Sequence, residues 1–240
     1  MFTTGKGLIT PPDETRLWRY MNLSAFLQLL LSGKFYFCLR TELADKWEGV
    51  LSATVRNRIS TASAGGSLST EGLSRVCGAL ADKCGILCWH MNDCESIAMW
   101  DLYTNGIDGV AISTTMAKLK RAMEGISEDC FVGKVEYTDH LAPDANGAAR
   151  QLGLLQPLFQ KRKSYSHECE VRAIISPLGL GKTSPTTGTS VGIDLTTLIE
   201  RIVVSRHYPE WGRRSLQKIV NEAGLTVEVE KSDLQNNPGG

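Results

Sequence analysis

The chain has 240 residues, enough for one large domain or two very small ones, and its 42% hydrophobic and 22% charged residues are ordinary for a globular protein. Its 26 basic and 26 acidic side chains give a formal net charge of zero, so the net charge does not indicate binding to nucleic acids or anionic membranes. The sequence has no apolar run of about 18 residues and no secretory signal pattern. Seven cysteines, an odd number, favour reduced thiols. We therefore expect a cytoplasmic protein with no membrane partner.

The first half of the chain predicts short strands and helices. A strand at 17–21 leads into a helix at 23–31, for which Asn22 is a suitable N-cap and Gly33 a suitable terminator. The Gly/Ser-rich stretch 61–69 is expected to be a loop. Further strands are expected at 34–39, 85–90 and 110–113, and further helices at 41–58, 72–82, 96–104 and 115–124.

The second half continues this mixture. It predicts helices at 146–162, with a break at Pro157, and at 209–223, and strands at 131–137, 168–176, 202–205 and 226–229. A polar loop or hairpin is expected at 177–189, and a disordered tail at 235–240. Because no regular βαβ rhythm is visible, we expect the α+β class: a single domain over 1–234, with a mixed or antiparallel sheet flanked by helices.

The segment around His167 carries an unusual charge pattern. If 168–176 is a strand, Glu168, Glu170 and Arg172 point to one face. Two adjacent carboxylates repel, which raises the pKa of one and equips the pair for acid/base chemistry, while the nearby Arg holds one of them ionised. The same spacing also fits a solvated edge-strand face whose charges neutralise each other.

Two further groups are candidates for binding. Arg19 lies between aromatic residues in the first strand, and an arginine is suited to binding carboxylate or phosphate; an exposed or structurally paired arginine is the alternative. Trp100 and Tyr103 are three residues apart on a predicted helix, so they share a face that either stacks on a base or packs in the core.

The cysteine spacing does not support a metal site. Cys84, Cys88, His90 and Cys94 match no standard zinc motif, so we expect no metal. The segment 179–183 lacks the earlier glycine of a phosphate loop, because Ser176 stands there.

Several short segments follow one another in a characteristic order along nearly the whole chain. They are Leu17-Trp18-Arg19-Tyr20, Gly33-Lys34-Phe35-Tyr36-Phe37, Asp45-Lys46-Trp47-Glu48-Gly49, Met99-Trp100 with Tyr103, Gly109-Val110-Ala111-Ile112, Lys161 to Arg172, and Ile202-Val203-Val204-Ser205. Their order resembles the bacterial domain-of-unknown-function 2971 family. In that family the early acidic motif usually reads Asn-Asp-Pro-x-Glu, and the proline is missing here. The family implies no activity.

The layout is also similar, more remotely, to ADP-ribosyltransferases of the Arg–Ser–Glu type. That resemblance implies that Arg19 holds the phosphate or ribose of NAD, and that Glu170 orients the nicotinamide ribose and stabilises an oxocarbenium-like transition state. It also implies that Glu168 activates an acceptor. The middle Ser-Thr-Ser motif is matched only in part, by Ser113-Thr114-Thr115.

Two kinds of function stay open on the sequence alone. One is an ADP-ribosyltransferase-like enzyme that consumes NAD in bacterial or phage conflict. The other is a non-enzymatic nucleotide-binding or protein-interaction module that uses the same pocket. The protein acceptor or partner is not specified. The candidate site residues are, as catalytic groups, Glu170 and Glu168, and, for the cofactor, Arg19, Tyr20, Trp100, Tyr103 and Arg172.

Overall fold

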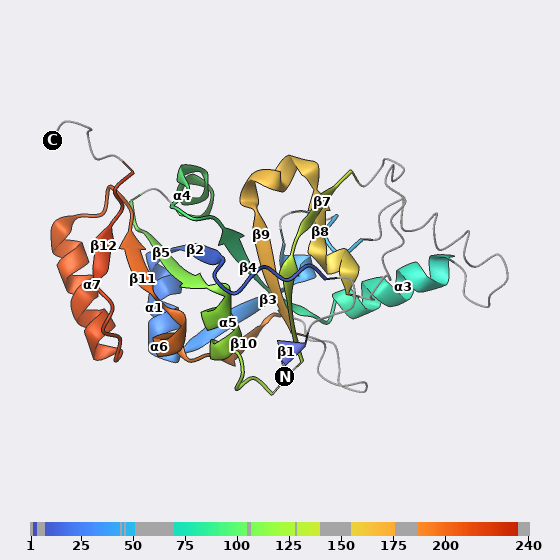
Figure 1. Ribbon diagram of the computed structural model, residues 1–240, viewed down its shortest axis with the longest axis horizontal. Helices are drawn as coiled ribbons and strands as arrows, with labels where there is room; N and C mark the ends of the chain where they lie inside the picture. The colour runs from blue at the N-terminus through green and yellow to red at the C-terminus, as the bar shows by residue number, and fades with distance from the viewer. Residues whose placement is uncertain are drawn as a thin grey trace. The chain divides into compact units, whose positions relative to one another are not determined.

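The computed structural model describes residues 2–3, 8–43, 45, 47–50, 70–104, 107–127, 129–139, 155–175 and 187–234 (Figure 1). Their contacts divide the chain into two compact units, each built from three separate segments. Unit 1 comprises Met1–Thr10, Tyr36–Leu87 and Glu128–Thr189, and unit 2 comprises Pro11–Phe35, Cys88–Ser127 and Ser190–Gly240. The predicted single domain stays a prediction. The predicted loop at 61–69 and tail at 235–240 lie outside the described residues.

Strands and helices alternate irregularly along the chain, and most described strand pairs are antiparallel. This arrangement confirms the predicted α+β class with a mixed sheet. Parallel pairing joins β1 (Phe2–Thr3) to β6 (Cys130–Lys134), β7 (Glu136–Thr138) to β8 (Gln160–Arg162), and β11 (Arg201–Val204) to β12 (Val229–Lys231).

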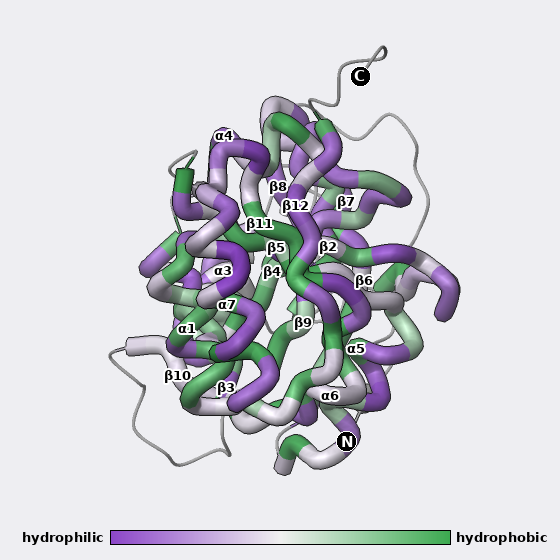
Figure 2. The backbone as a smooth tube through the Cα atoms, turned by 90° about the vertical axis from the view of Figure 1, so that its left-hand side faces the viewer, coloured by the Kyte–Doolittle hydropathy of each residue, from purple (hydrophilic) through white to green (hydrophobic). Residues whose placement is uncertain are grey.

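The strands of unit 2 centre on β2 (Arg16–Asn22). It pairs antiparallel with β5 (Gly109–Thr115) on one side and with the last residues of β4 (Gly85–Met91) on the other, so that Trp18 lies opposite both Ser113 and His90. Strand β11 then pairs with β5, and β12 with β11. In Figure 2 the hydrophobic colour follows β5 and β11, as expected of buried strands.

Helix α1 (Leu23–Ser32) begins and ends where the sequence predicts. The side chain of Asn22 accepts a hydrogen bond from the Ala25 amide at 2.8 Å, which satisfies one of the free amides at the helix start. Gly33 adopts φ 61, a conformation that favours glycine, and its amide donates to the Leu29 carbonyl. The other helices of unit 2 are α4 (Ile97–Tyr103), α5 (Met116–Ala122), α6 (Leu195–Leu198) and α7 (Glu210–Glu222).

Side chains of α7 cover the outer edge of β12. Gln217 accepts a hydrogen bond from the Val229 amide at 2.7 Å, and the Arg213 guanidinium donates to the Val229 carbonyl at 2.8 Å. These bonds satisfy backbone groups that an edge strand otherwise leaves unpaired. The helix therefore protects this edge of unit 2 against pairing with another strand.

Unit 1 is built around β9 (Glu170–Ile175). This strand lies between β6 and β4 in the strand order, and its residues pair antiparallel with β6, from Ile175 opposite Cys130 to Val171 opposite Lys134. All six residues of β9 are buried. The remaining elements that include residues of unit 1 are β3 (Lys34–Leu39), α3 (Thr70–Ala81), β10 (Thr189–Gly192) and the 3-10 helices η1 (Arg40–Glu42), η2 (Gln156–Phe159) and η3 (Lys163–Glu168).

Two helices predicted from the sequence are wrong over their described parts. In the predicted helix at 41–58, the described residues form η1 and turns: Glu42 accepts a hydrogen bond from the Leu39 amide, and Gly49 adopts φ 72. In the predicted helix at 146–162, the described residues form η2 and then β8. Pro157 sits in the first turn of η2, where its missing N–H is harmless, whereas a proline inside a longer helix removes a backbone hydrogen bond.

Candidate functional site

The two candidate catalytic glutamates lie on either side of a left-handed residue. Glu168 ends η3, Cys169 adopts φ 41, and Glu170 begins β9. The predicted strand at 168–176 is therefore wrong at its start, because a positive φ turns the chain out of the extended conformation there. The two-residue alternation of a strand does not apply to Glu168, and its neighbours have to be found in three dimensions.

Lys161 brings the two glutamates together. Its Nζ lies 2.6 Å from Oε2 of Glu168 and 3.2 Å from Oε1 of Glu170. A third carboxylate, that of Glu48, lies 3.4 Å from the same nitrogen. The ammonium therefore sits among three carboxylates, all within unit 1.

Arg172 completes the arrangement, which we call the charged cluster: Glu48, Lys161, Glu168, Glu170 and Arg172. Its Nε donates to Oε2 of Glu170 at 2.8 Å, and its other nitrogens donate to the Glu48 carboxylate and the Leu158 carbonyl. The contact with Glu170 confirms that positions 170 and 172 share one face of a strand.

The charged cluster is buried. Glu168 and Glu170 are 6% and 4% exposed, and Arg172 is 0% exposed. The alternative of a solvated edge-strand face is therefore wrong, because β9 is flanked by strands on both sides. The burial of Arg172 also argues against the predicted direct contact between its guanidinium and a cofactor, because the guanidinium donates to acceptors of the protein itself.

Burial and charge move the pKa values of the two glutamates in opposite directions. Desolvation, followed by the hydrogen bond with Glu170, raises the pKa of Glu168 to about 7. Burial also acts to raise the pKa of Glu170, but the charges of Arg172 and Lys161 outweigh it and lower that pKa to about 2. With Glu168 protonated, two carboxylates face two cations and the charged cluster is neutral. This agrees with the expectation that one carboxyl of the pair carries a proton while an arginine keeps the other ionised.

Several neighbours of this pair were not among the predicted site residues. The hydroxyl of Tyr137 accepts a hydrogen bond from the Glu170 amide at 2.7 Å, and the Tyr165 ring centre lies 4.8 Å from the Lys161 nitrogen. Asp45 forms two hydrogen bonds with the Arg162 guanidinium, at 3.0 and 3.1 Å. Asp45 and Glu48 both belong to the segment 45–49, whose sequence resembles a family motif and does not by itself indicate ion-pair partners.

Arg19 belongs to unit 2, where its guanidinium has partners of its own. Its Nη1 donates to the Cys88 carbonyl at 2.5 Å, and its Cζ lies 5.7 Å from the centre of the Phe35 ring. The side chain is partly exposed. A role for Arg19 in holding an anionic group of a cofactor stays a prediction.

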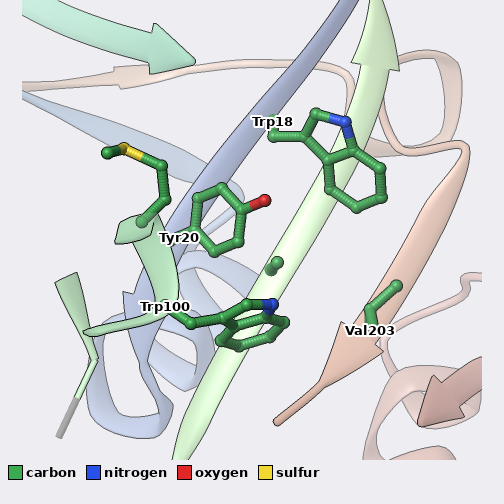
Figure 3. Packing of buried hydrophobic residues seen from close by; sticks show 6 residues of the cluster. Trp18, Tyr20, Trp100 and Val203 are labelled. Carbon is green, nitrogen blue, oxygen red and sulfur yellow. The ribbon is translucent and has the colours of Figure 1, made fainter. Parts of the chain in front are cut away.

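The aromatic candidates of unit 2 differ in exposure. Tyr20 and Trp100 are both 7% exposed and pack edge to face, with ring centres 5.1 Å apart, in a cluster that includes Trp18 (Figure 3). The Trp100 indole donates to the Glu95 carboxylate at 3.0 Å. Tyr103 is 47% exposed. Of the two uses that the sequence leaves open, core packing is therefore the one observed for Trp100. Stacking on Tyr103 and cofactor contacts of these residues stay predictions.

The described residues contain neither a cluster of metal-ligating side chains nor a membrane-spanning helix. Within them, no group of three or more His, Cys, Asp or Glu side chains is placed to hold a metal ion. None of the helices in the described ranges is long and apolar enough to cross a membrane.

Comparison with known proteins gives similarity to solved structures only. No family model matches the chain, and no curated protein matches it, so the resemblance to the domain-of-unknown-function family stays a prediction. The chain is similar to Thermus sp. 2.9 DarT in complex with NAD+, at 11% identity and a TM-score of 0.43, over 93% of this chain and 98% of that one. For the same protein in complex with ADP-ribosylated ssDNA, the identity is 12% and the TM-score 0.42, over 94% of this chain and 97% of that one. For its complex with carba-NAD+, the identity is 11% and the TM-score 0.41, over 92% of this chain and 96% of that one. At these identities and TM-scores the likeness carries no argument about function.

Proposed function

We propose that the chain is an ADP-ribosyltransferase-like enzyme that consumes NAD, with Glu170 and Glu168 as its catalytic residues. The bond between nicotinamide and ribose breaks, and nicotinamide leaves with the bonding electron pair. The carboxylate of Glu170 stabilises the positive charge that develops on the ribose. Glu168 accepts the proton of the acceptor group as the acceptor bonds to the ribose carbon.

The observation that carries this proposal is the contact of two carboxyl groups whose pKa values move apart. Glu170 is held ionised by Arg172 and Lys161, as a carboxylate that stabilises a cationic transition state must be. Glu168 has a pKa of about 7, which suits a group that accepts and returns a proton near neutral pH. Pairs of titratable groups with divergent pKa values are typical of acid/base sites.

The remaining candidates take supporting roles in this proposal. Arg19 binds an anionic part of NAD, because an arginine fork matches phosphate oxygens. Tyr103 offers an exposed ring for stacking, while Tyr20 and Trp100 form the packed layer of the same unit. Arg172 acts through Glu170, to which it donates, and not by touching the cofactor.

A specific observation favours the second candidate, a non-enzymatic nucleotide-binding or protein-interaction module. Both glutamates are almost fully buried, and two cations neutralise the charge around them. A buried ion network of this kind can serve the fold alone. In that case, NAD or another nucleotide binds without turnover, or a protein partner binds and no nucleotide does.

Incubation with NAD labelled in the nicotinamide and in the adenosine separates the two candidates. The wild type is compared with the Glu170→Gln and Glu168→Gln variants, with Glu222→Gln on the exposed surface of α7 as the matched control. We expect nicotinamide release by the wild type and the control, and at least a hundredfold slower release by Glu170→Gln, from the size of electrostatic transition-state effects. Equal release by Glu170→Gln and the wild type would exclude the catalytic role.

The acceptor is identified in the same assay from transfer of the adenosine label. Separate reactions contain single-stranded DNA, RNA or a protein extract, since the sequence specifies none of them. Calorimetry with NAD and ADP-ribose covers the second candidate, for which we expect binding heat with no nicotinamide release. A role in bacterial or phage conflict, which is part of the proposal, predicts fewer phage plaques on cells that express the wild type than on cells that express Glu170→Gln.

A further inference from the structure

Lys161 has a role in the charged cluster that differs from those of the other members. It lies at the centre of the short strand β8 and its side chain is 7% exposed. Its nitrogen is within 3.4 Å of oxygens from three carboxylates that come from three parts of unit 1: the turn at Glu48, the end of η3 and the start of β9.

The ammonium group of this lysine hydrogen-bonds two carboxylates and forms an ion pair with a third. An ammonium group has three N–H donors, and the three carboxylates lie at 2.6, 3.2 and 3.4 Å from the nitrogen. The ring of Tyr165 lies 4.8 Å away and covers the ammonium further. With its donors directed at protein carboxylates, Lys161 is suited to orienting groups and not to contacting a substrate.

We propose that Lys161 is the positioning residue of the carboxyl pair: its ammonium holds Glu168 and Glu170 side by side, so that the pair shares one proton. The inference rests on the proposed function, because it assumes that this pair carries out the acid/base step. Glu48 contacts Lys161 and Arg172 alike and so fixes both cations with respect to the pair.

The other charged and titratable groups around the pair do not replace this contact. Arg172 lies on the Glu170 side, where its guanidinium donates to Glu170, Glu48 and the Leu158 carbonyl. Tyr137 contributes its hydroxyl to the Glu170 amide. Removing the ammonium takes a positive charge away from the buried Glu168 carboxyl, and the loss of that charge disfavours its ionised form.

The test is a pH titration of the glutamate side-chain carboxyl carbons by nuclear magnetic resonance on the full chain. The signal of Glu168 is the one that disappears in Glu168→Gln. In Lys161→Met, we expect the titration midpoint of Glu168 to move upward by at least about one pH unit. In Lys161→Arg, which conserves the charge, we expect the midpoint to lie within about half a pH unit of the wild-type value. Lys218→Met, an exposed change on α7, is the matched control and is expected to leave the midpoint unchanged.

A second variant keeps the test decisive if Lys161→Met does not fold. The double variant Lys161→Met/Glu48→Gln removes one positive and one negative charge from the charged cluster. Because the lost Glu48 charge offsets part of the lost ammonium charge, we expect an upward shift that is smaller than in Lys161→Met. An unchanged midpoint in either variant overturns the proposal, and so does failure of both to fold, because the lysine would then serve the fold and not the pair. The titration needs no NAD, so a wild type without turnover would refute the proposed function and leave this result standing.

Discussion

Replacing Glu168 by glutamine should make the protein more stable at alkaline pH. The pKa of this carboxyl is raised from 4.5 to about 7 in the folded state, chiefly by desolvation. Between these values the folded state binds more protons than the unfolded state, so stability is fully present below pH 4.5 and is lost as the pH rises through 7. A difference of about 2.5 pH units corresponds to about 3 kcal/mol. Glutamine resembles the protonated form and cannot titrate, which removes this loss.

The assay is equilibrium unfolding in urea at pH 5, 6, 7 and 8, followed by tryptophan fluorescence. Other groups that titrate in this range affect both proteins, so the quantity of interest is the difference between wild type and Glu168→Gln. Because part of the loss has already occurred at pH 5, we expect the difference to grow by about 2.5 kcal/mol in favour of the variant from pH 5 to pH 8. The lowered pKa of Glu170 affects stability in a separate, acidic pH range: the stability that it contributes above pH 4.5 is lost as the pH falls through about 2. A difference that is constant with pH, or Glu222→Gln behaving as Glu168→Gln does, would refute the assigned pKa.

Three further changes have consequences that follow from single contacts. Arg172→Met leaves buried carboxylates without their guanidinium and should lower the free energy of unfolding by about 3–5 kcal/mol, measured in urea at pH 7. Asn22→Ala removes the N-cap bond of α1 and should cost about 1 kcal/mol in the same measurement. Tyr20→Phe removes the acceptor of the Ser96 amide, 2.9 Å from the hydroxyl; we expect a loss of about 1–3 kcal/mol with the near-ultraviolet circular dichroism retained.

Features determined by neighbours in the chain could be predicted from the sequence. Helix α1 is the clearest case, because Asn22, an apolar periodic segment and Gly33 act within one short stretch, and the structure has the predicted cap at each end. The predicted strand at 17–21 likewise falls within β2, where aromatic and β-forming residues favour the extended state. Local chemistry was misleading at Cys169, since a non-glycine residue at φ 41 has no reliable sequence signal.

The candidate site was predictable only in part, because contacts between residues far apart in the sequence help to build it. Spacing alone placed Glu170 and Arg172 on one face, and the structure joins them by a hydrogen bond. The contact between Arg172 and Glu48 spans 124 residues, and no periodicity reports on such a separation. Lys161 is close to the glutamates in sequence, but its role depends on β8 being a strand, whereas the sequence pattern favoured a helix.

The presence of a glutamate at position 168 is the strongest physical argument that the charged cluster does more than hold the fold. A purely structural cluster needs no third ionisable acid, because Glu48 and Glu170 already balance Lys161 and Arg172. Glutamine at 168 would retain an oxygen acceptor for the lysine and would avoid the loss of about 3 kcal/mol above pH 7. Stability therefore gives no reason for a carboxyl at this position, and the proposed proton transfer near neutral pH gives one. If Glu168→Gln is more stable than the wild type at pH 8 and yet transfers no ADP-ribose to an acceptor, this one variant supports both the assigned pKa and the proposed proton transfer.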